Sequence, residues 1–320
     1  MKRAPILLLL AVLAVAAWYF MKPKPAATPA LGTRVALTPL PDLAAQFSGE
    51  KAYEHIKAIC AFGPRPPASE GYAKTLAYLE AEFAKAGWTT ERQNFERVPR
   101  FLGESTNRPA VKFTNLLARH DKADWKQSVP VVISGHVDSK LMEGVPFVAA
   151  NDGGSSTGII VELARVLATD PKAAANVELV LFDGEEALLG NITESDGLYG
   201  SKYYAREISL RQTWPSLGIV LDLVGDKEYP ARYNPDFPRN LSTALEAAAK
   251  DSSLALRPYD GLITDDHVPL QGTGLQMLHL IGDFGSMPYW HKPGDTLEVI
   301  DAEALEQTGR TVLRFLARVK

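Results

Sequence analysis

The sequence predicts an α/β fold, in which helices cover both faces of a mostly parallel sheet. Short runs of apolar and β-branched residues alternate along the chain with amphipathic stretches, which is the pattern of strands connected by helices. Polar residues capable of chemistry directly follow several of the apolar runs. In open sheets of this class, ligands bind beyond the carboxyl ends of the strands, so the position of these residues supports the same fold.

The elements can be placed in order from these patterns. A helix begins after Ser69, a plausible N-cap, and ends near Gly87. Strands at 88–98 and 112–120 are expected to form an outer hairpin or sheet edge. The remaining predicted elements are a strand at 128–139, a helix at 155–170, strands at 177–182 and 216–225, a helix at 240–252, a strand at 274–282 and a closing helix at 302–318.

Composition limits the kinds of site that the chain can build. The 320 residues are 46% hydrophobic and 22% charged, as expected of a globular protein with a full core. The net charge of -4 leaves no basic surface for nucleic acid, so that class of partner is excluded. Cys60 is the single cysteine, which excludes an internal disulfide and a thiolate-rich zinc site. Any metal must therefore be held by His, Asp and Glu.

The N-terminus has the features of an export segment. Lys2 and Arg3 precede an apolar stretch of roughly 18 residues, which is just long enough to cross a bilayer core. We expect residues 1–21 to be an uncleaved signal anchor, or else a signal peptide cut near the string AVA. Residues 22–45 are expected to form a Pro/Ala-rich linker, and 46–320 the catalytic domain. The domain is then extracytoplasmic, on the periplasmic or secreted side.

Carboxylates gather where one predicted strand ends. In "VELVLFDGEEALLG", the apolar run Val177–Phe182 leads into Asp183, Glu185 and Glu186. Neighbouring anions are costly close to a low-dielectric interior unless a cation compensates them. The segment is therefore either a solvated turn or a metal site, in which one carboxylate binds the ion and another carries protons.

Comparable residues follow the other predicted strands. They are His136 and Asp138, Asn151 and Asp152, Asp222, Asp265 to His267, and His291. A single polar residue at a strand end is usually a cap or turn residue, but this many around one sheet edge is not expected by chance. Oxygen and nitrogen donors without sulfur suit a catalytic zinc ion with an open position.

Several segments resemble those of a known family. They are "GHVDSK", "FVAANDGGSS", "LFDGEEALL", "ESDGLYGSKYYA", "LDLVGD", "DDHVPL", "LHLI" and "YWHKPGDT". In order and spacing they resemble the zinc-dependent aminopeptidase superfamily and, within it, the animal-type glutaminyl cyclases (glutaminyl-peptide cyclotransferases). The resemblance covers roughly residues 50–318. It implies a three-layer sandwich with a mostly parallel mixed central sheet flanked by helices.

The resemblance also implies roles for individual residues. Asp152, Glu186 and His291 match the ligands of a single zinc ion. The implied substrates are peptides or proteins with a free N-terminal Gln, and the chain is expected to bind the membrane only through its N-terminal segment and to act as a monomer.

The catalytic residues are implied in the same way. Glu185 matches the acid/base, with Asp222 and Asp265 as its hydrogen-bonded neighbours, and Trp290 flanks the substrate pocket. Asn191 departs from the pattern, because the cyclase loop usually has an aromatic residue there.

A di-zinc aminopeptidase of the same superfamily is the alternative. Asp152 would then bridge two metals, with His136 and Asp222 completing the second site, while Glu185 would activate water. Trp290 favours the cyclase, because peptidases more often have another residue at that position. A catalytically inactive relative is not supported, since every proposed ligand is present. His279 is interpreted as a core histidine.

Overall fold

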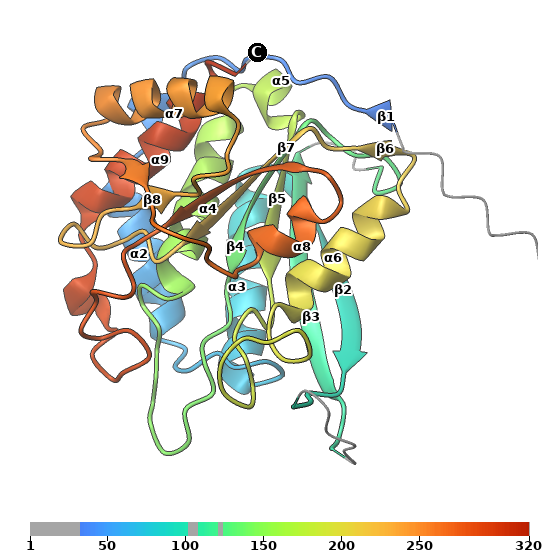
Figure 1. Ribbon diagram of the computed structural model, residues 1–320, viewed down its shortest axis with the longest axis vertical. Helices are drawn as coiled ribbons and strands as arrows, with labels where there is room; N and C mark the ends of the chain where they lie inside the picture. Colours follow the sequence, from blue (N-terminus) through green and yellow to red (C-terminus); the bar gives the residue numbers. More distant parts are fainter. Residues whose placement is uncertain (1–32, 102–107, 121–123, 320) are drawn as a thin grey trace, which may run out of the picture. The chain divides into compact units, whose positions relative to one another are not determined.

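The computed structural model describes residues 33–101, 108–120 and 124–319 (Figure 1). The helices are α2 (Gly49–Cys60), α3 (Glu70–Lys85), α4 (Gly154–Leu167), α5 (Pro171–Ala174), α6 (Tyr199–Ser209), α7 (Arg239–Asp251), α8 (His267–Gln271) and α9 (Ala302–Leu316), with 3-10 turns η1 (Ala44–Gln46) and η2 (Leu297–Val299). The strands are β1 (Thr33–Arg34), β2 (Trp88–Arg97), β3 (Val111–His120), β4 (Val131–His136), β5 (Val177–Phe182), β6 (Thr213–Trp214), β7 (Leu217–Asp222), β8 (Arg232–Tyr233), β9 (Arg257–Pro258) and β10 (Gln276–Ile281).

The central sheet has eight strands in the order β2-β3-β5-β4-β7-β10-β8-β9. Its middle, β5-β4-β7-β10, is parallel throughout. The edges add antiparallel pairs, because β3 runs against both β5 and β2, and β8 runs against β10. The predicted α/β class with a mostly parallel mixed sheet is therefore confirmed, and the four parallel strands all end at the same edge.

Side chains of the central strands alternate between two cores. Ile133, Leu179 and Ile219 belong to the larger core, which is shared with α2, α3, α4, α7 and α9. Their chain neighbours Val132, Val180 and Val220 belong to a smaller core that includes residues of α6 and α8. A strand presents successive side chains to opposite faces, so strands that are apolar at every position must be covered on both. The result is the expected three layers (Figure 1).

The helix boundaries follow local chemistry. Ser69 accepts a hydrogen bond from the backbone N–H of Tyr72 and so caps α3, as predicted. Gly87 follows the helix with φ of 79°, a left-handed conformation that glycine adopts at little cost. The predicted outer hairpin is the antiparallel pair β2–β3. Four helices, α2, α5, α6 and α8, are absent from the sequence-based assignment, and two of them, α5 and α8, have only four and five residues.

The segment before α2 packs onto the domain. Within the predicted linker 22–45, Thr33 and Arg34 pair with β6, and the backbone N–H of Leu40 binds the carbonyl oxygen of Leu316. Leu40 and Leu43 are buried in the larger core. Residues 33–45 are thus part of the packed domain.

The predicted signal anchor at 1–21 lies outside the described residues. Among the residues that the structure does describe, no helix combines the length and apolar character needed to cross a membrane.

Gly158 tests the packing of α2 against α4. A Cβ at this position would lie 2.6 Å from the carbonyl oxygen of Ala52, a backbone atom that cannot move without shifting the helix. Overpacking costs about 1–3 kcal/mol, whereas replacing a helical glycine by alanine gains about 1 kcal/mol. We therefore expect Gly158→Ala to lower the free energy of unfolding measured by urea denaturation. Gly285→Ala, with no atom within 4 Å of its added Cβ, is the control; equal stability of the two variants would contradict this packing.

Candidate active site

One pocket lies at the carboxyl ends of the parallel strands, and it gathers residues from segments far apart in the sequence. Its lining comprises Asp152, Glu185, Glu186, Ile192, Asp222, Leu223, Ile263, Thr264, Asp265, Ile281, Phe284, Trp290 and His291. Every residue that the sequence assigned to catalysis, substrate binding or the first metal site is among them. His136, the second-metal candidate, is buried beside the pocket and contacts Asp152 and Asp222.

Three of the pocket residues have the geometry of a metal site. One ligand atom each from Asp152, Glu186 and His291 lies within 4.8 Å of the others. His291 Nε2 is 3.1 Å from Glu186 Oε1 and 3.4 Å from Asp152 Oδ2, yet both oxygens are buried without a hydrogen-bond partner. Buried acceptors are costly when unpaired. A cation bound between them would satisfy both, and two carboxylates with one imidazole suit zinc.

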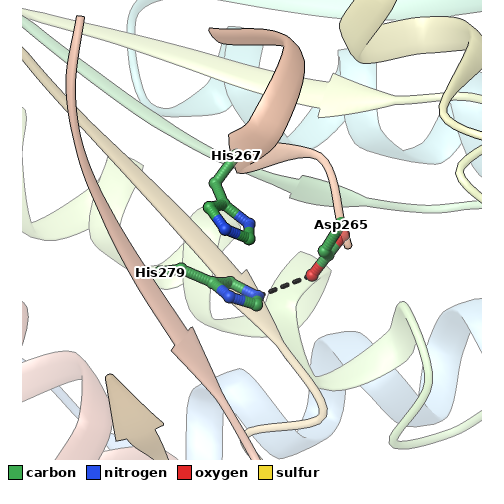
Figure 2. Close-up of side chains that lie close together, drawn as sticks. All are labelled: Asp265, His267 and His279. Carbon is green, nitrogen blue, oxygen red and sulfur yellow. Dashed lines mark hydrogen bonds and ion pairs between the residues drawn. The ribbon is translucent and has the colours of Figure 1, made fainter. Parts of the chain in front are cut away.

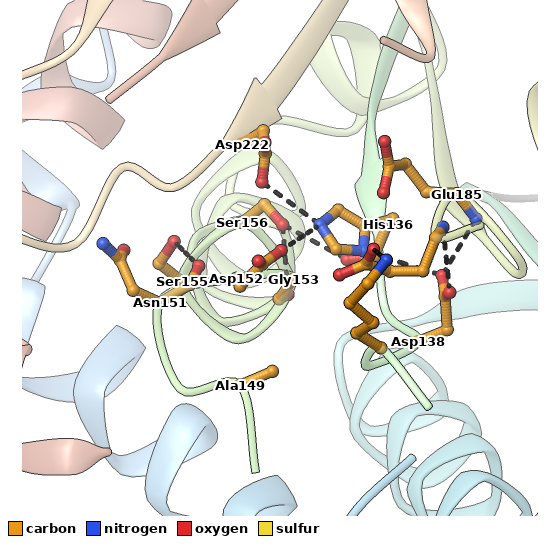
Figure 3. Close-up of polar contacts among 12 residues, drawn as sticks. His136, Asp138, Ala149, Asn151, Asp152, Gly153, Ser155, Ser156, Glu185 and Asp222 are labelled. Atoms are coloured by element: carbon orange, nitrogen blue, oxygen red, sulfur yellow. Dashed lines mark hydrogen bonds and ion pairs between the residues drawn. The ribbon is translucent and has the colours of Figure 1, made fainter. Parts of the chain in front are cut away.

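His136 lies between two carboxylates (Figure 3). Its Nε2 is 3.1 Å from Asp152 Oδ1 and 3.1 Å from Asp222 Oδ1. Burial lowers the pKa of His136, but hydrogen bonds to Asp138, Asp152 and Asp222 outweigh it and raise that pKa well above its usual value. The three side chains could hold a second metal, as the aminopeptidase alternative requires. The same positions are also satisfied by a protonated imidazole.

A third cluster contains Asp265, His267 and His279 (Figure 2). His279 is hydrogen-bonded at both nitrogens, through Nε2 to Asp265 Oδ2 at 2.6 Å and through Nδ1 to the Tyr259 hydroxyl at 3.2 Å. The His267 ring stacks on that of His279, with centroids 4.1 Å apart and planes 16° from parallel. Imidazole lone pairs lie in the ring plane, so stacked rings do not converge on one ion. The cluster instead fixes the orientation of Asp265.

Glu185 is held by its backbone. The N–H groups of Glu185 and Glu186 donate to the two oxygens of Asp138, at 3.2 and 3.3 Å (Figure 3). Burial raises the pKa of Glu185 well above its usual value; His136 opposes this shift, and the charges of Asp265, Glu186 and Asp266 add to it. A carboxyl with a raised pKa can both accept and return a proton near neutral pH.

The carboxylates at the end of β5 thus have different environments. Asp183 points away from the pocket and accepts the Thr114 backbone N–H at 2.6 Å. Glu185 and Glu186 line the pocket.

The aspartates near Glu185 differ from expectation in their hydrogen bonds. The sequence predicted that Asp222 and Asp265 would bond to Glu185, but Asp222 bonds to His136 and Asp265 to His279. Each aspartate lies on the pocket wall with a histidine behind it, because strands β4 and β10 bring those histidines to the same edge of the sheet. Asp265 therefore acts on Glu185 through its charge rather than by a hydrogen bond.

Lys140 was not predicted as a site residue. Its Nζ donates to Glu186 Oε2 at 3.0 Å and to the carbonyl oxygen of Gly190 at 3.0 Å. This contact occupies one oxygen of Glu186 and leaves Oε1 facing His291. A single lysine after a strand carries no spacing signal, although it lies in the motif "GHVDSK".

The rest of the pocket is apolar and includes strained backbone. His291 and Leu223 have φ of 50° and 53°, values that residues other than glycine rarely adopt and that are often found at functional sites. Trp290 stacks on His291 with centroids 4.2 Å apart and packs against Phe284 at 4.9 Å. Ile192, directly after Asn191, forms part of the pocket wall.

Comparisons with known proteins identify the family. The model of peptidase family M28 matches residues 115–316, which include the carboxyl ends of all four central strands. The chain belongs to peptidase family M28. This M28 domain is 28% identical to a glutaminyl-peptide cyclotransferase-like protein from Bos taurus over 288 residues, covering 79% of this chain and 71% of that protein.

Solved structures share the fold of this M28 domain. The Tannerella forsythia glutaminyl cyclase superposes with a TM-score of 0.72 at 26% identity, covering 86% of this chain and 100% of that one. A leucine aminopeptidase precursor from Bacteroides thetaiotaomicron superposes with a TM-score of 0.74 at 23% identity, covering 86% and 98%. The second likeness concerns the fold alone.

Because Asp152 Oδ2 and Glu186 Oε1 are buried without a hydrogen-bond partner, we expect zinc to stabilise the protein. A ligand that binds only the folded state at 100 times its Kd adds about 2.7 kcal/mol, so zinc should raise the Tm of the chelator-treated protein in a thermal scan. Glu186→Gln removes a charged ligand and should abolish most of this rise. Glu298→Gln, an exposed position, is the control. A rise in Tm that is the same in both variants would show that zinc binds elsewhere.

Proposed function

We propose that this M28 protein is a zinc-dependent glutaminyl-peptide cyclotransferase, which converts an N-terminal Gln to pyroglutamate and releases ammonia. The observation that carries the proposal is the pairing of Glu185, a buried carboxyl, with a neighbouring group whose unpaired oxygens suit one cation. The similarity to glutaminyl cyclases over most of the chain supports it.

Zinc held by Asp152, Glu186 and His291 would act as a Lewis acid on the γ-carboxamide oxygen of the substrate. Glu185 would accept a proton from the α-amine as that nitrogen forms a bond to the γ-carboxamide carbon. Glu185 would then return the proton to the departing nitrogen, which leaves as ammonia when the C–N bond breaks. The charge of Asp265 raises the pKa of Glu185, and so helps its carboxylate to accept the proton.

The apolar walls of the pocket support an intramolecular reaction. Ile263, Ile281 and Trp290 surround the carboxylates and limit the access of water to the bound carboxamide. The flat ring of Trp290, which stacks on His291, would hold the methylene groups of the glutamine side chain.

A di-zinc aminopeptidase is the second candidate, and His136 is the residue that favours it. Together with Asp152 and Asp222 it forms the additional ligand group that this reaction needs. Against it, His136 Nε2 lies 3.1 Å from both Asp152 Oδ1 and Asp222 Oδ1 and compensates their charges, whereas Glu186 Oε1 and Asp152 Oδ2 have no hydrogen-bond partner. These contacts fit a site with one metal ion better than a site with two, and a single zinc ion is what the cyclase reaction needs.

The proposed activity agrees with an extracytoplasmic location. The residues before the domain have the composition of an export segment, and peptides or proteins with free N-terminal Gln would be the substrates. We propose that residues 1–21 anchor the protein to the membrane or are removed on export, and that the domain acts as a monomer.

The purified protein should release ammonia from a Gln-initiated dipeptide and form pyroglutamate. A coupled ammonia assay, run beside a generic aminopeptidase substrate, separates the two candidates. One bound zinc per chain by elemental analysis accompanies the cyclase, and two accompany the peptidase. Release of free amino acids from unblocked peptides, with N-terminal Gln left uncyclised, would refute the proposal.

Glu185→Gln tests the proton carrier. The amide cannot accept the proton of the α-amine, so kcat should fall on the order of 10²–10⁴-fold. Zinc content should remain at the wild-type value, because Glu185 is not a ligand. Asp183→Asn, at the neighbouring carboxyl that points away from the pocket, shows how much a local structural change contributes. A kcat for Glu185→Gln close to that of the wild type would exclude the assigned role.

A further inference from the structure

Two buried residues of opposite charge hold the chain segment that leads to Asp152. The first, Arg65, lies between α2 and α3 and is 0% exposed. Its Nε donates to the carbonyl oxygen of Val137 at 3.0 Å, and its two Nη atoms donate to those of Val148 and Ala149 at 2.6 and 3.0 Å. Within the described residues its side chain forms no ion pair, so backbone carbonyl groups compensate this charge.

The second residue, Asp295, is also 0% exposed and follows His291 by four positions. One carboxylate oxygen accepts the backbone N–H of Asn151 at 2.7 Å, and the other accepts that of Asp152 at 3.0 Å. The backbone N–H of Ala150 donates to the Asp295 carbonyl oxygen at 3.3 Å. Asp295 therefore connects the loop of one proposed zinc ligand to the loop of another.

Together these residues form what we call the Arg65–Asp295 clamp. The cation binds carbonyl groups at the start of segment 148–152, and the anion binds N–H groups at its end. Between them Ala149 has φ of 47°, a conformation that a residue other than glycine keeps only when its surroundings enforce it. The path of the segment is thus fixed by contacts within the protein.

The next residue after the segment restricts the path further. Gly153 has φ of 79°, and a Cβ there would lie 2.8 Å from the carbonyl oxygen of Asp138 and 2.9 Å from the ring of His136. Asp152 is therefore held between the clamp on one side and the strand end of β4 on the other. Arg65 also binds that strand end through Val137.

We infer that Arg65 and Asp295 are positioning residues, which set the separation of Asp152 and His291 needed to bind zinc. Neither residue lines the pocket, so neither can act on the substrate directly. Lysine cannot replace Arg65, because a single ammonium group does not present the planar set of donors that reaches carbonyl groups of two segments. The inference rests on the proposed function only in assigning zinc to Asp152 and His291.

The test compares zinc affinity in Arg65→Lys, Asp295→Asn and a control, Arg119→Lys. Arg119 is also buried and donates to the carbonyl oxygens of Asp124 and Gln127, but it pairs with Glu178 near the start of β5, away from the pocket. Both clamp variants should bind zinc about 10–100-fold more weakly than the wild type in competition with a chromophoric chelator. Arg119→Lys should lose thermal stability and keep its zinc affinity.

A purely structural role for the clamp predicts a different result, in which all three variants lose stability and none loses affinity. Wild-type zinc affinity in either folded clamp variant would overturn the inference. If Arg65→Lys does not fold, the zinc affinity of Asp295→Asn alone still tests it. Zinc affinity is measured without substrate. A wild-type protein that binds zinc but releases no ammonia therefore refutes the cyclase proposal while the clamp is still tested.

Discussion

Compensation of buried negative charge is the constraint on which the site depends. Asp152, Glu186, Asp222 and Asp265 approach one another at the edge of a sheet that is covered on both faces, where unpaired charge is costly. A histidine or lysine side chain lies within hydrogen-bond or ion-pair distance of each of these carboxylates. Two of their oxygens have no hydrogen-bond partner and could bind a cation. No lysine or histidine among the described residues is hydrogen-bonded to the side chain of Glu185, and burial raises its pKa well above the usual value.

The parallel sheet makes this concentration of charge possible. Strands β4, β5, β7 and β10 all end at the same edge, so residues separated by more than a hundred positions become neighbours without long loops. Local contacts and backbone conformations then orient each residue. The backbone is in the left-handed conformation at Gly153 and at His291, and the carboxylate of Asp138 binds the backbone N–H of Glu185.

Much of this arrangement could be predicted from the sequence, for identifiable reasons. Apolar strands of six residues and the polar residues after them are local signals, so the sheet class and the pocket residues followed directly. The hydrogen-bond partners of Asp222 and Asp265 could not be predicted in this way. Which histidine lies beside which carboxylate depends on the order of the strands in the sheet, and this order is not a local signal. Arg65 gave no signal, since an arginine between prolines looks like an exposed loop residue until the fold surrounds it.

The hydrogen bonds that two successive N–H groups donate to Asp138 have a consequence for substitutions in the site. They hold the backbone of Glu185 and Glu186 at one carboxylate, so loss of the Asp138 side chain would displace both glutamates together. Ile192, Ile263 and Trp290 come from three separate loops with no such shared anchor. A substitution in one of those loops would therefore change the pocket wall at one place and leave the positions of Glu185 and Glu186 unchanged.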